Sequence, residues 1–246
     1  MEKGADNQLA NKSGQISETL RRAILAQRLV PGTKLGEREL SEKFDSSRIV
    51  IRQALLMLAG EGLVTIERNR GAFVKRYSLQ EAMEIYDALT LFEQGVAVQL
   101  ASRLGTADWQ KIRDHIKLQA EAIDQGDNEL ADNLGAGFHE LLVSLTNNRL
   151  AQEIHSQIVQ RTHLLRSLYN SRFDYCNLLN EHSKIVDLLE RGRVKQAMSL
   201  IESHHHHVVR GYVMDMSNYP QMTLDEALSP FLTAEEQKNS FAAAGI

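Results

Sequence analysis

The feature that most constrains the fold is the helical periodicity of the chain from Gln80 onward. Six segments follow one another with apolar residues at helical spacing, separated by short polar or glycine-containing breaks such as Gly105-Thr106 and Arg191-Gly192-Arg193. Strand-like alternation is absent from this part of the sequence. Apolar stripes of this kind bury one side of each helix in a bundle, so we expect an all-helical domain over residues 80–217. Its expected inward positions include Met83, Leu89, Ile112, Leu130, Phe138, Ile154, Ile185 and Ile201.

The first 76 residues have a different pattern. Helical spacing predicts three short helices, and the breaks between them fall at Pro31-Gly32 and at Asp45-Ser46-Ser47. Two short apolar segments around a polar turn then predict a hairpin. Helix, helix, turn, helix and hairpin is the order of a winged helix-turn-helix domain, which we place at residues 15–76, so that the whole fold is mainly α. The expected helices are Ile16–Leu29, Glu37–Phe44 and Ser47–Ala59, the strands are Leu63–Ile66 and Ala72–Lys75, and residues 1–14 and 218–246 are expected to be a disordered N-terminal tail and a C-terminal tail.

Charge separates these two regions. Residues 15–76 contain 12 basic and 7 acidic residues, whereas the remainder contains 16 basic and 25 acidic residues. A basic module attached to an acidic one is typical of a polyanion-binding domain joined to a domain with another role. The polar N-terminus, the lack of a long apolar run and the lone Cys176 indicate a cytoplasmic protein with no membrane segment.

The third predicted helix carries the best candidates for contacts with DNA. Its apolar stripe faces inward, and Arg48 and Arg52 lie four residues apart at the edge of that stripe. The planar fork of an arginine can bridge the two acceptors of guanine in the major groove or clamp a phosphate. Four arginines on the exposed side of a helix-turn-helix favour DNA binding over a merely solvated surface. The predicted contacts are Arg38, Ser47, Arg48, Ile49, Arg52, Arg70 and Gly71, the last two at the tip of the hairpin.

The chain resembles the GntR family of bacterial transcription regulators, and its helical part resembles the FadR-type effector domain of that family, so that the similarity spans residues 15–216. The resemblance implies a homodimer that binds a short inverted-repeat operator in double-stranded DNA, with a small-molecule effector in the helical domain that alters DNA affinity. It implies that Arg38, Arg48, Arg52 and Gly71 contact DNA, while Ser46 and Ile49–Ile51 depart from the usual residues. The stretches that carry it are Leu29-Val30-Pro31-Gly32-Thr33-Lys34-Leu35, Glu37-Arg38-Glu39-Leu40, Arg52-Gln53-Ala54-Leu55, Glu61-Gly62-Leu63-Val64 and Gly71-Ala72-Phe73-Val74.

The resemblance also implies a metal centre in the helical domain. His139, His182 and His204 occupy positions similar to those of the family's ligand histidines, each on a different expected helix. Neutral imidazoles from separate helices can hold zinc, nickel or manganese and leave positions open for a ligand. Gly135 stands where the family usually has an aspartate ligand, and Asp132 could contribute only through water.

The effector pocket is expected to differ from that of the family. Leu89 stands where many relatives carry an arginine that would pair with an effector carboxylate. We therefore expect an effector that depends less on a carboxylate, such as a neutral or heterocyclic molecule. In the run His204–His207, His204 is expected to be the one ligand and the other three bystanders. The candidate pocket residues are Tyr86, Leu89, Glu93, Asp132, His163 and Arg166.

Three classes of function fit these features to different degrees. The first is a ligand-responsive transcription regulator, here a repressor, whose effector shifts the dimer between states of different operator affinity. The second is an enzyme in which a metal on three histidines activates water, but the sequence has no HExxH pattern, glycine-rich phosphate loop or Ser-His-Asp order, so we expect no enzyme. The third is a metal-responsive regulator with no organic effector.

Overall fold

The computed structural model describes residues 2–215, 219 and 222–232, and these form two compact units. The first unit comprises the chain up to Tyr77, the short stretch Ser167–Tyr169 and the described residues after Met214. The second unit comprises Ser78–Arg166 and Asn170–Met214. The main boundary at Tyr77 therefore lies next to the expected end of the winged helix-turn-helix domain at residue 76.

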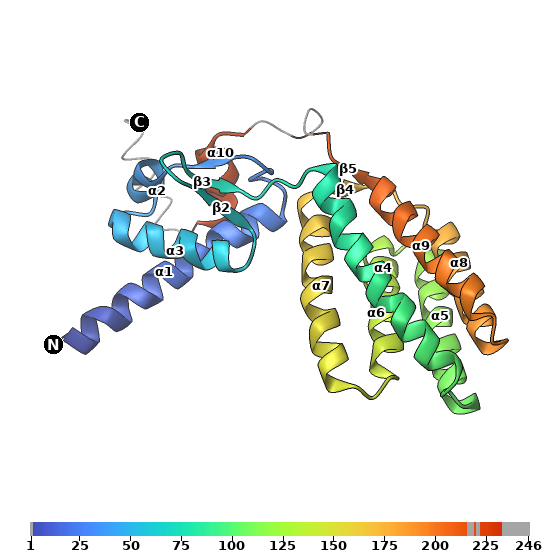
Figure 1. The fold of residues 1–246 in the computed structure, drawn as a ribbon. Coiled ribbons are helices and arrows are strands. Elements are labelled where there is room, and N and C mark those ends of the chain that lie inside the picture. The colour runs from blue at the N-terminus through green and yellow to red at the C-terminus, as the bar shows by residue number, and fades with distance from the viewer. Residues whose placement is uncertain (1, 216–218, 220–221, 233–246) are drawn as a thin grey trace. The chain divides into compact units, whose positions relative to one another are not determined.

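The first unit is a winged helix-turn-helix, which confirms the predicted fold of this region (Figure 1). Its three strands form an antiparallel sheet in the order β1-β3-β2, in which Phe73 of the central strand lies opposite Lys34 on one side and Thr65 on the other. The elements are α1 (Glu2–Leu25), β1 (Lys34–Leu35), α2 (Glu37–Lys43), α3 (Arg48–Gly60), β2 (Val64–Glu67) and β3 (Gly71–Val74).

Local chemistry explains where α3 begins and which face it buries. Asp45, just after the end of α2, has a φ of +43°. Aspartate adopts this left-handed conformation more readily than most residues, and the helix does not continue through it. Ser47 is the N-cap, because its Oγ accepts a hydrogen bond of 3.4 Å from the backbone N–H of Val50. The opposite face of α3 is left to solvent, since its buried residues are Val50, Ile51, Ala54, Leu55 and Leu58.

Both chain ends of this unit differ from the expected tails. Helix α1 begins at Glu2, so the expectation of a disordered stretch over residues 2–14 is wrong, and Ser13 is already buried. Near the other end, residues within the expected tail 218–246 form helix α10 (Leu224–Leu228) and the 3₁₀ turn η2 (Ser229–Phe231). Leu224, Ala227 and Leu228 bury their side chains, which stabilises these elements. Residues 218, 220–221 and 233–246 of that expected tail lie outside the described residues.

The second unit is a bundle of the six helices that the sequence predicts. Figure 1 shows them running alongside one another, with the short strands β4 and β5 at one end. Val96, Trp109, Phe138, Ile185 and Ile201 belong to its buried core, to which five of the helices contribute. The elements are α4 (Leu79–Ala101), α5 (Thr106–Asp124), α6 (Asn128–Ser144), α7 (Arg149–Leu168), β4 (Asn170–Ser171), α8 (Tyr175–Glu190), α9 (Val194–Gly211) and β5 (Tyr212–Val213).

A membrane span requires a long helix with few charges. Among the residues described, none of the helices has the length and apolar content to cross a membrane.

Candidate DNA-binding surface and metal centre

The solvent face of α3 presents the residues predicted to contact DNA. Arg48 and Ile49 are exposed in its first turn, and the side chain of Arg52 is 63% exposed one turn later. Arg38 projects from the neighbouring α2, with its side chain 78% exposed and its Nε 3.4 Å from Glu42 Oε1. Three guanidinium groups on two adjacent helices make a positively charged surface of the kind that binds phosphates and base edges.

Arg52 is held in position by Glu37. Its Nε lies 2.9 Å from Glu37 Oε1 and its Nη2 lies 2.7 Å from Glu37 Oε2, so the pair is bidentate. The hydrogen bonds from Arg52, with a further contribution from the charge of Arg48, lower the pKa of Glu37. A guanidinium has five N–H donors and this pair uses two, so Arg52 keeps donors for DNA while α2 fixes its direction.

The tip of the hairpin carries the other two predicted contacts. Arg70 pairs with Glu67 and lies over the ring of Phe73, with its Cζ 5.4 Å from the ring centroid. Gly71 has a φ of +100°, a conformation that favours glycine, and a Cβ there would meet nothing within 4 Å. The glycine is therefore required by the backbone of the turn, not by crowding within the protein.

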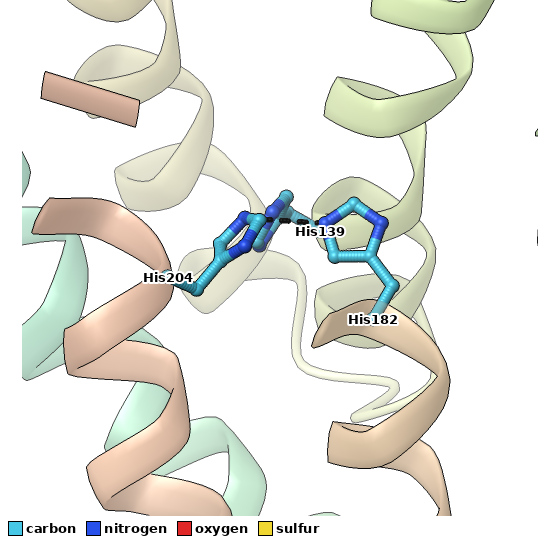
Figure 2. A group of neighbouring side chains, drawn as sticks. All are labelled: His139, His182 and His204. Carbon is cyan, nitrogen blue, oxygen red and sulfur yellow. Dashed lines mark hydrogen bonds between the residues drawn. The ribbon is translucent and has the colours of Figure 1, made fainter. Parts of the chain in front are cut away.

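The three histidines predicted as metal ligands converge in the helical unit. His139 comes from α6, His182 from α8 and His204 from α9, and Figure 2 shows their rings pointing toward a common centre. One ring nitrogen of each lies within 4.8 Å of the others, and His182 Nε2 is 3.2 Å from His204 Nε2. His182 and His204 are buried and His139 is half-buried.

Each of these rings has its other nitrogen held by an oxygen. His139 Nδ1 lies 2.7 Å from a carboxylate oxygen of Glu93, and His204 Nδ1 lies 2.9 Å from one of Glu181. His182 Nδ1 lies 3.0 Å from the amide oxygen of Gln119. An oxygen acceptor at Nδ1 favours the tautomer with hydrogen on Nδ1, which leaves the lone pair of Nε2 free for a metal. The donor set therefore fits a divalent cation.

The electrostatics of the cluster also favour a cation. Burial lowers the pKa of His182 well below its usual value, and burial lowers the pKa of His204 to about 4, so both rings are neutral near pH 7. Burial alone would raise the pKa of Glu93, but its interactions with the surrounding histidines outweigh this and hold that pKa well below the usual value. Burial opposes a low pKa at Glu181 too, and His204 and His207 nevertheless lower it. Neutral ligand rings backed by two charged carboxylates attract a positive ion.

A pocket opens beside the three histidines. Its empty volume is about 580 Å³, a figure that includes space open to solvent. Of the predicted pocket residues, Tyr86, Leu89, Asp132 and Arg166 line it together with His139, His182 and His204. Glu93 lies behind His139 instead, and His163 is not part of the lining.

His205 corrects the expectation for the histidine run. It was expected to be a bystander, but it is buried, lines the same pocket and places its Nδ1 2.7 Å from Thr90 Oγ1. Its Nε2 is buried 3.3 Å from Glu93 Oε2 without the geometry of a hydrogen bond. His206 is half-buried with its Nε2 3.8 Å from Asp87 Oδ1, and the exposed His207 contacts Glu181. Neighbouring helix positions are only about 100° apart, so a wide inward face includes both His204 and His205.

Two residues that support the site, His155 and Gln119, were not predicted. Glu93 also contacts His155, whose Nε2 lies 3.0 Å from Glu93 Oε1, so that His139, His155 and His205 surround one carboxylate. A lone histidine or glutamine within an amphipathic helix has no local signature, which is why His155 and Gln119 were missed.

Comparison with protein families identifies the chain. Residues 12–74 match the family described as bacterial regulatory proteins, gntR family, and residues 84–207 match the FCD domain. The chain belongs to the GntR family.

Relatives and solved structures agree with this assignment. The chain is 28% identical over 181 residues to the HTH-type transcriptional repressor RspR of Escherichia coli K12, an alignment that covers 72% of this chain and 78% of the relative. It is 32% identical over 181 residues to the HTH-type transcriptional repressor NagR of Bacillus subtilis 168, covering 72% and 65%. The structure of a transcriptional regulator GntR from Rhodococcus sp. RHA1 has the same fold, with a TM-score of 0.56, 23% identity and coverage of 81% and 96%. The chain is a DNA-binding transcription regulator and not an enzyme.

In this GntR-family chain, Gln119 fills the space beside Gly135, where the family resemblance implies an aspartate ligand. A Cβ at Gly135 would lie 3.0 Å from Gln119 Nε2 and 3.9 Å from His182 Cε1, so the amide of Gln119 occupies the space beside the histidine. Asp132 is engaged elsewhere, because its Oδ2 lies 3.2 Å from Arg166 Nε. The acidic groups nearest the histidines are therefore Glu93 and Glu181, which contact Nδ1 atoms.

Proposed function

We propose that this GntR-family chain is a cytoplasmic, dimeric repressor whose affinity for an inverted-repeat operator depends on what occupies the histidine pocket. The observation that carries the proposal is the convergence of one ring nitrogen from each of His139, His182 and His204 beside a pocket that these histidines line. RspR and NagR, both named as repressors, support the sign of regulation.

The dimer has a candidate surface on α4. Leu91 is 74% exposed and Val98 is 49% exposed. Two small exposed residues lie on the same helix face, Ala88 one turn before Leu91 and Gly95 between Leu91 and Val98. Small and apolar residues spaced three and four apart allow two helices to pack closely. A second copy of this chain at this face would bury the apolar side chains and bring two DNA-binding units together for the two half-sites of an operator.

A divalent cation, zinc, nickel or manganese, would be held by His139, His182 and His204. Bound there, it would supply an anchor for a ligand atom at an open coordination position. It would also tie α6, α8 and α9 together through their side chains, which stabilises the bundle whenever the cation is bound.

The pocket favours an effector that does not rely on a carboxylate. Leu89 is buried in the lining, at the position where the family resemblance implies an arginine. Arg166 is the guanidinium that lines the pocket, and the charge of Asp132 at 3.2 Å balances it. A neutral or heterocyclic ligand that coordinates the cation and packs on Leu89 suits these surroundings, and a Leu89→Arg substitution is expected to shift ligand preference toward carboxylates.

A metal-responsive regulator without an organic effector is the second candidate. It is favoured by the completeness of the histidine cluster, in which every Nδ1 already has an oxygen partner. A pocket lined by Leu89, Val159 and Val208 serves no purpose in that case, which is why we rank it second.

The test is a titration of purified protein against a labelled duplex from the region upstream of its own gene, followed by fluorescence anisotropy. We expect salt-dependent binding whose affinity changes when a chelator removes the cation and returns when zinc is added. A further change in DNA affinity when copurifying small molecules are added supports an organic effector. A full change in DNA affinity with zinc alone supports the second candidate. No binding to any such duplex at low salt would refute both.

A further inference from the structure

The C-terminal segment, defined here as Tyr219 and residues 222–232, belongs to the DNA-binding unit. It lies outside the residues that match either family domain, 12–74 and 84–207. Ala227 and Leu228 are fully buried, and Tyr219, Leu224 and Leu232 are each less than 9% exposed. A segment with five buried apolar side chains is packed into the unit and not merely laid over its surface.

The segment packs on α1, and polar contacts join it to α2 and to the turn that follows α1. Arg28 donates from Nη2 to the carbonyl of Glu226 at 2.7 Å and from Nε to the carbonyl of Ala227 at 3.2 Å, which satisfies carbonyls left open at the end of α10. Lys43, the last residue of α2, forms an ion pair with Asp225 although its own side chain is only 8% exposed.

The same segment follows, along the chain, the helix that carries the proposed metal ligand His204. Helix α9 holds His204 and His205 and is followed by β5, where the Tyr212 hydroxyl lies 2.8 Å from that of Tyr86 in the pocket lining. Two residues later, after Met214, the chain enters the DNA-binding unit.

Within the DNA-binding unit, the segment reaches the DNA-contacting surface through one helix. Helix α2 contacts Asp225 at its C-terminal end through Lys43 and holds Arg52 at its N-terminal end through Glu37. A change in the ion pair between the segment and α2 can therefore alter the position of Arg52.

We propose that the C-terminal segment is an intramolecular partner of α1 and α2 that transmits occupancy of the histidine pocket to the DNA-contacting arginines. The proposal rests on the proposed function, because it requires that occupancy changes DNA affinity. Coupling needs a physical element whose state both sites influence. This segment is joined covalently to α9, by packing to α1 and by the Lys43–Asp225 ion pair to α2.

The test compares Leu228→Asp with Ser229→Asp, which introduces the same charge one residue later at an exposed position. Each protein is titrated against the labelled duplex with the chelator and with zinc. Trp109 is the single tryptophan and lies in the core of the helical unit, so its fluorescence reports whether that unit remains folded. In wild type and Ser229→Asp we expect zinc to change the DNA affinity by about tenfold, within the usual range of coupling. In Leu228→Asp we expect normal zinc content and normal Trp109 fluorescence but a loss of this response.

Two outcomes would overturn the inference. One is a Leu228→Asp protein that still binds DNA and responds to zinc as wild type does. If Leu228→Asp loses DNA binding altogether, Asp225→Asn decides, because it removes only the exposed partner of Lys43. A diminished zinc response in that variant supports the inference, whereas an unchanged response refutes it. A wild-type protein that binds DNA without any response to zinc would instead contradict the proposed function.

Discussion

His182 Nε2 and His204 Nε2 lie 3.2 Å apart while the Nδ1 atom of each ring is held by an oxygen of another residue. Two ring nitrogens that both carry lone pairs repel each other at this distance unless a proton or a cation lies between them. Because burial lowers the pKa of both rings, a proton is disfavoured there, and a divalent cation is the better occupant.

Replacing Glu93 is expected to weaken the metal centre without removing a ligand. Glu93→Gln keeps the size of the side chain but removes the charge that orients His139 and accepts from its Nδ1. Loss of such an outer carboxylate typically lowers metal affinity by about 10- to 100-fold. The measurement is a competition titration with a zinc chelator. Glu140→Gln is the control because Glu140 is exposed next to His139, and equal affinities for the two variants would contradict the role of Glu93.

The metal-free protein is expected to lose stability as the pH falls from about 6.5 toward 4. The pKa of His204 is about 4 in the folded protein, against about 6.5 when unfolded, so the unfolded chain takes up the proton first. Stability from this group is therefore full above pH 6.5 and declines through that window, by about 3 kcal/mol in total. His139, His182, His205 and Glu181 face the same ring.

The measurement is thermal unfolding of the chelator-treated protein, followed by Trp109 fluorescence at several pH values. His204→Gln is expected to flatten the dependence. A wild-type melting temperature that stays constant between pH 7 and pH 5 would show that the ring is not held neutral.

Much of the fold could be predicted because it depends on local sequence patterns. The six apolar stripes, the cap at Ser47 and the turn before β3 depend on residues close in sequence, and the structure has these elements where they were expected. Met83, Leu130 and Ile154 were expected to face inward and are 37–44% exposed. Helical spacing marks a face but does not say how far the neighbouring helices extend over its edges.

The supporting residues of the site could not be predicted in the same way. Gln119 and Glu181 were not singled out, and Glu93 was a candidate pocket residue whose contact with His139 was not expected. These three residues reach the histidines from three different helices, and only the tertiary packing brings them together. The C-terminal helix, in contrast, has a local signal. Thr223 and Glu226 form a capping box before Ala227 and Leu228, a signature that marks a helix start.

Arg52→Ala is expected to abolish specific operator binding while the fold stays intact. One bidentate arginine contact to a base contributes about 1–3 kcal/mol of discrimination, and in this protein Glu37 already fixes the direction of the fork. The measurement is anisotropy with the operator and with an unrelated duplex. Arg149→Ala, which removes an exposed charge from the helical unit, serves as the control. Retained preference for the operator in Arg52→Ala would place the specific contact elsewhere.

Leu91→Arg is expected to convert the dimer to a monomer. At the proposed α4 interface, both copies would then bury a charged side chain. The free energy needed to remove these charges from water, together with their mutual repulsion, disfavours the dimer. Sedimentation velocity gives the mass, and Leu118→Arg introduces the same change at an exposed leucine of α5. A dimer that survives Leu91→Arg but not Leu118→Arg would move the interface to α5.

The most direct test of the central claim is the divalent ion content of the purified protein, measured by elemental analysis together with thermal stability. We expect about one ion per chain in the wild type and in His206→Ala, whose half-buried histidine lies on the same helix as His204 but near Asp87. In His182→Ala we expect the ion content and the melting temperature to fall together, because binding of the ion stabilises the folded chain. An unchanged ion content in His182→Ala would show that the three converging nitrogens do not hold the metal.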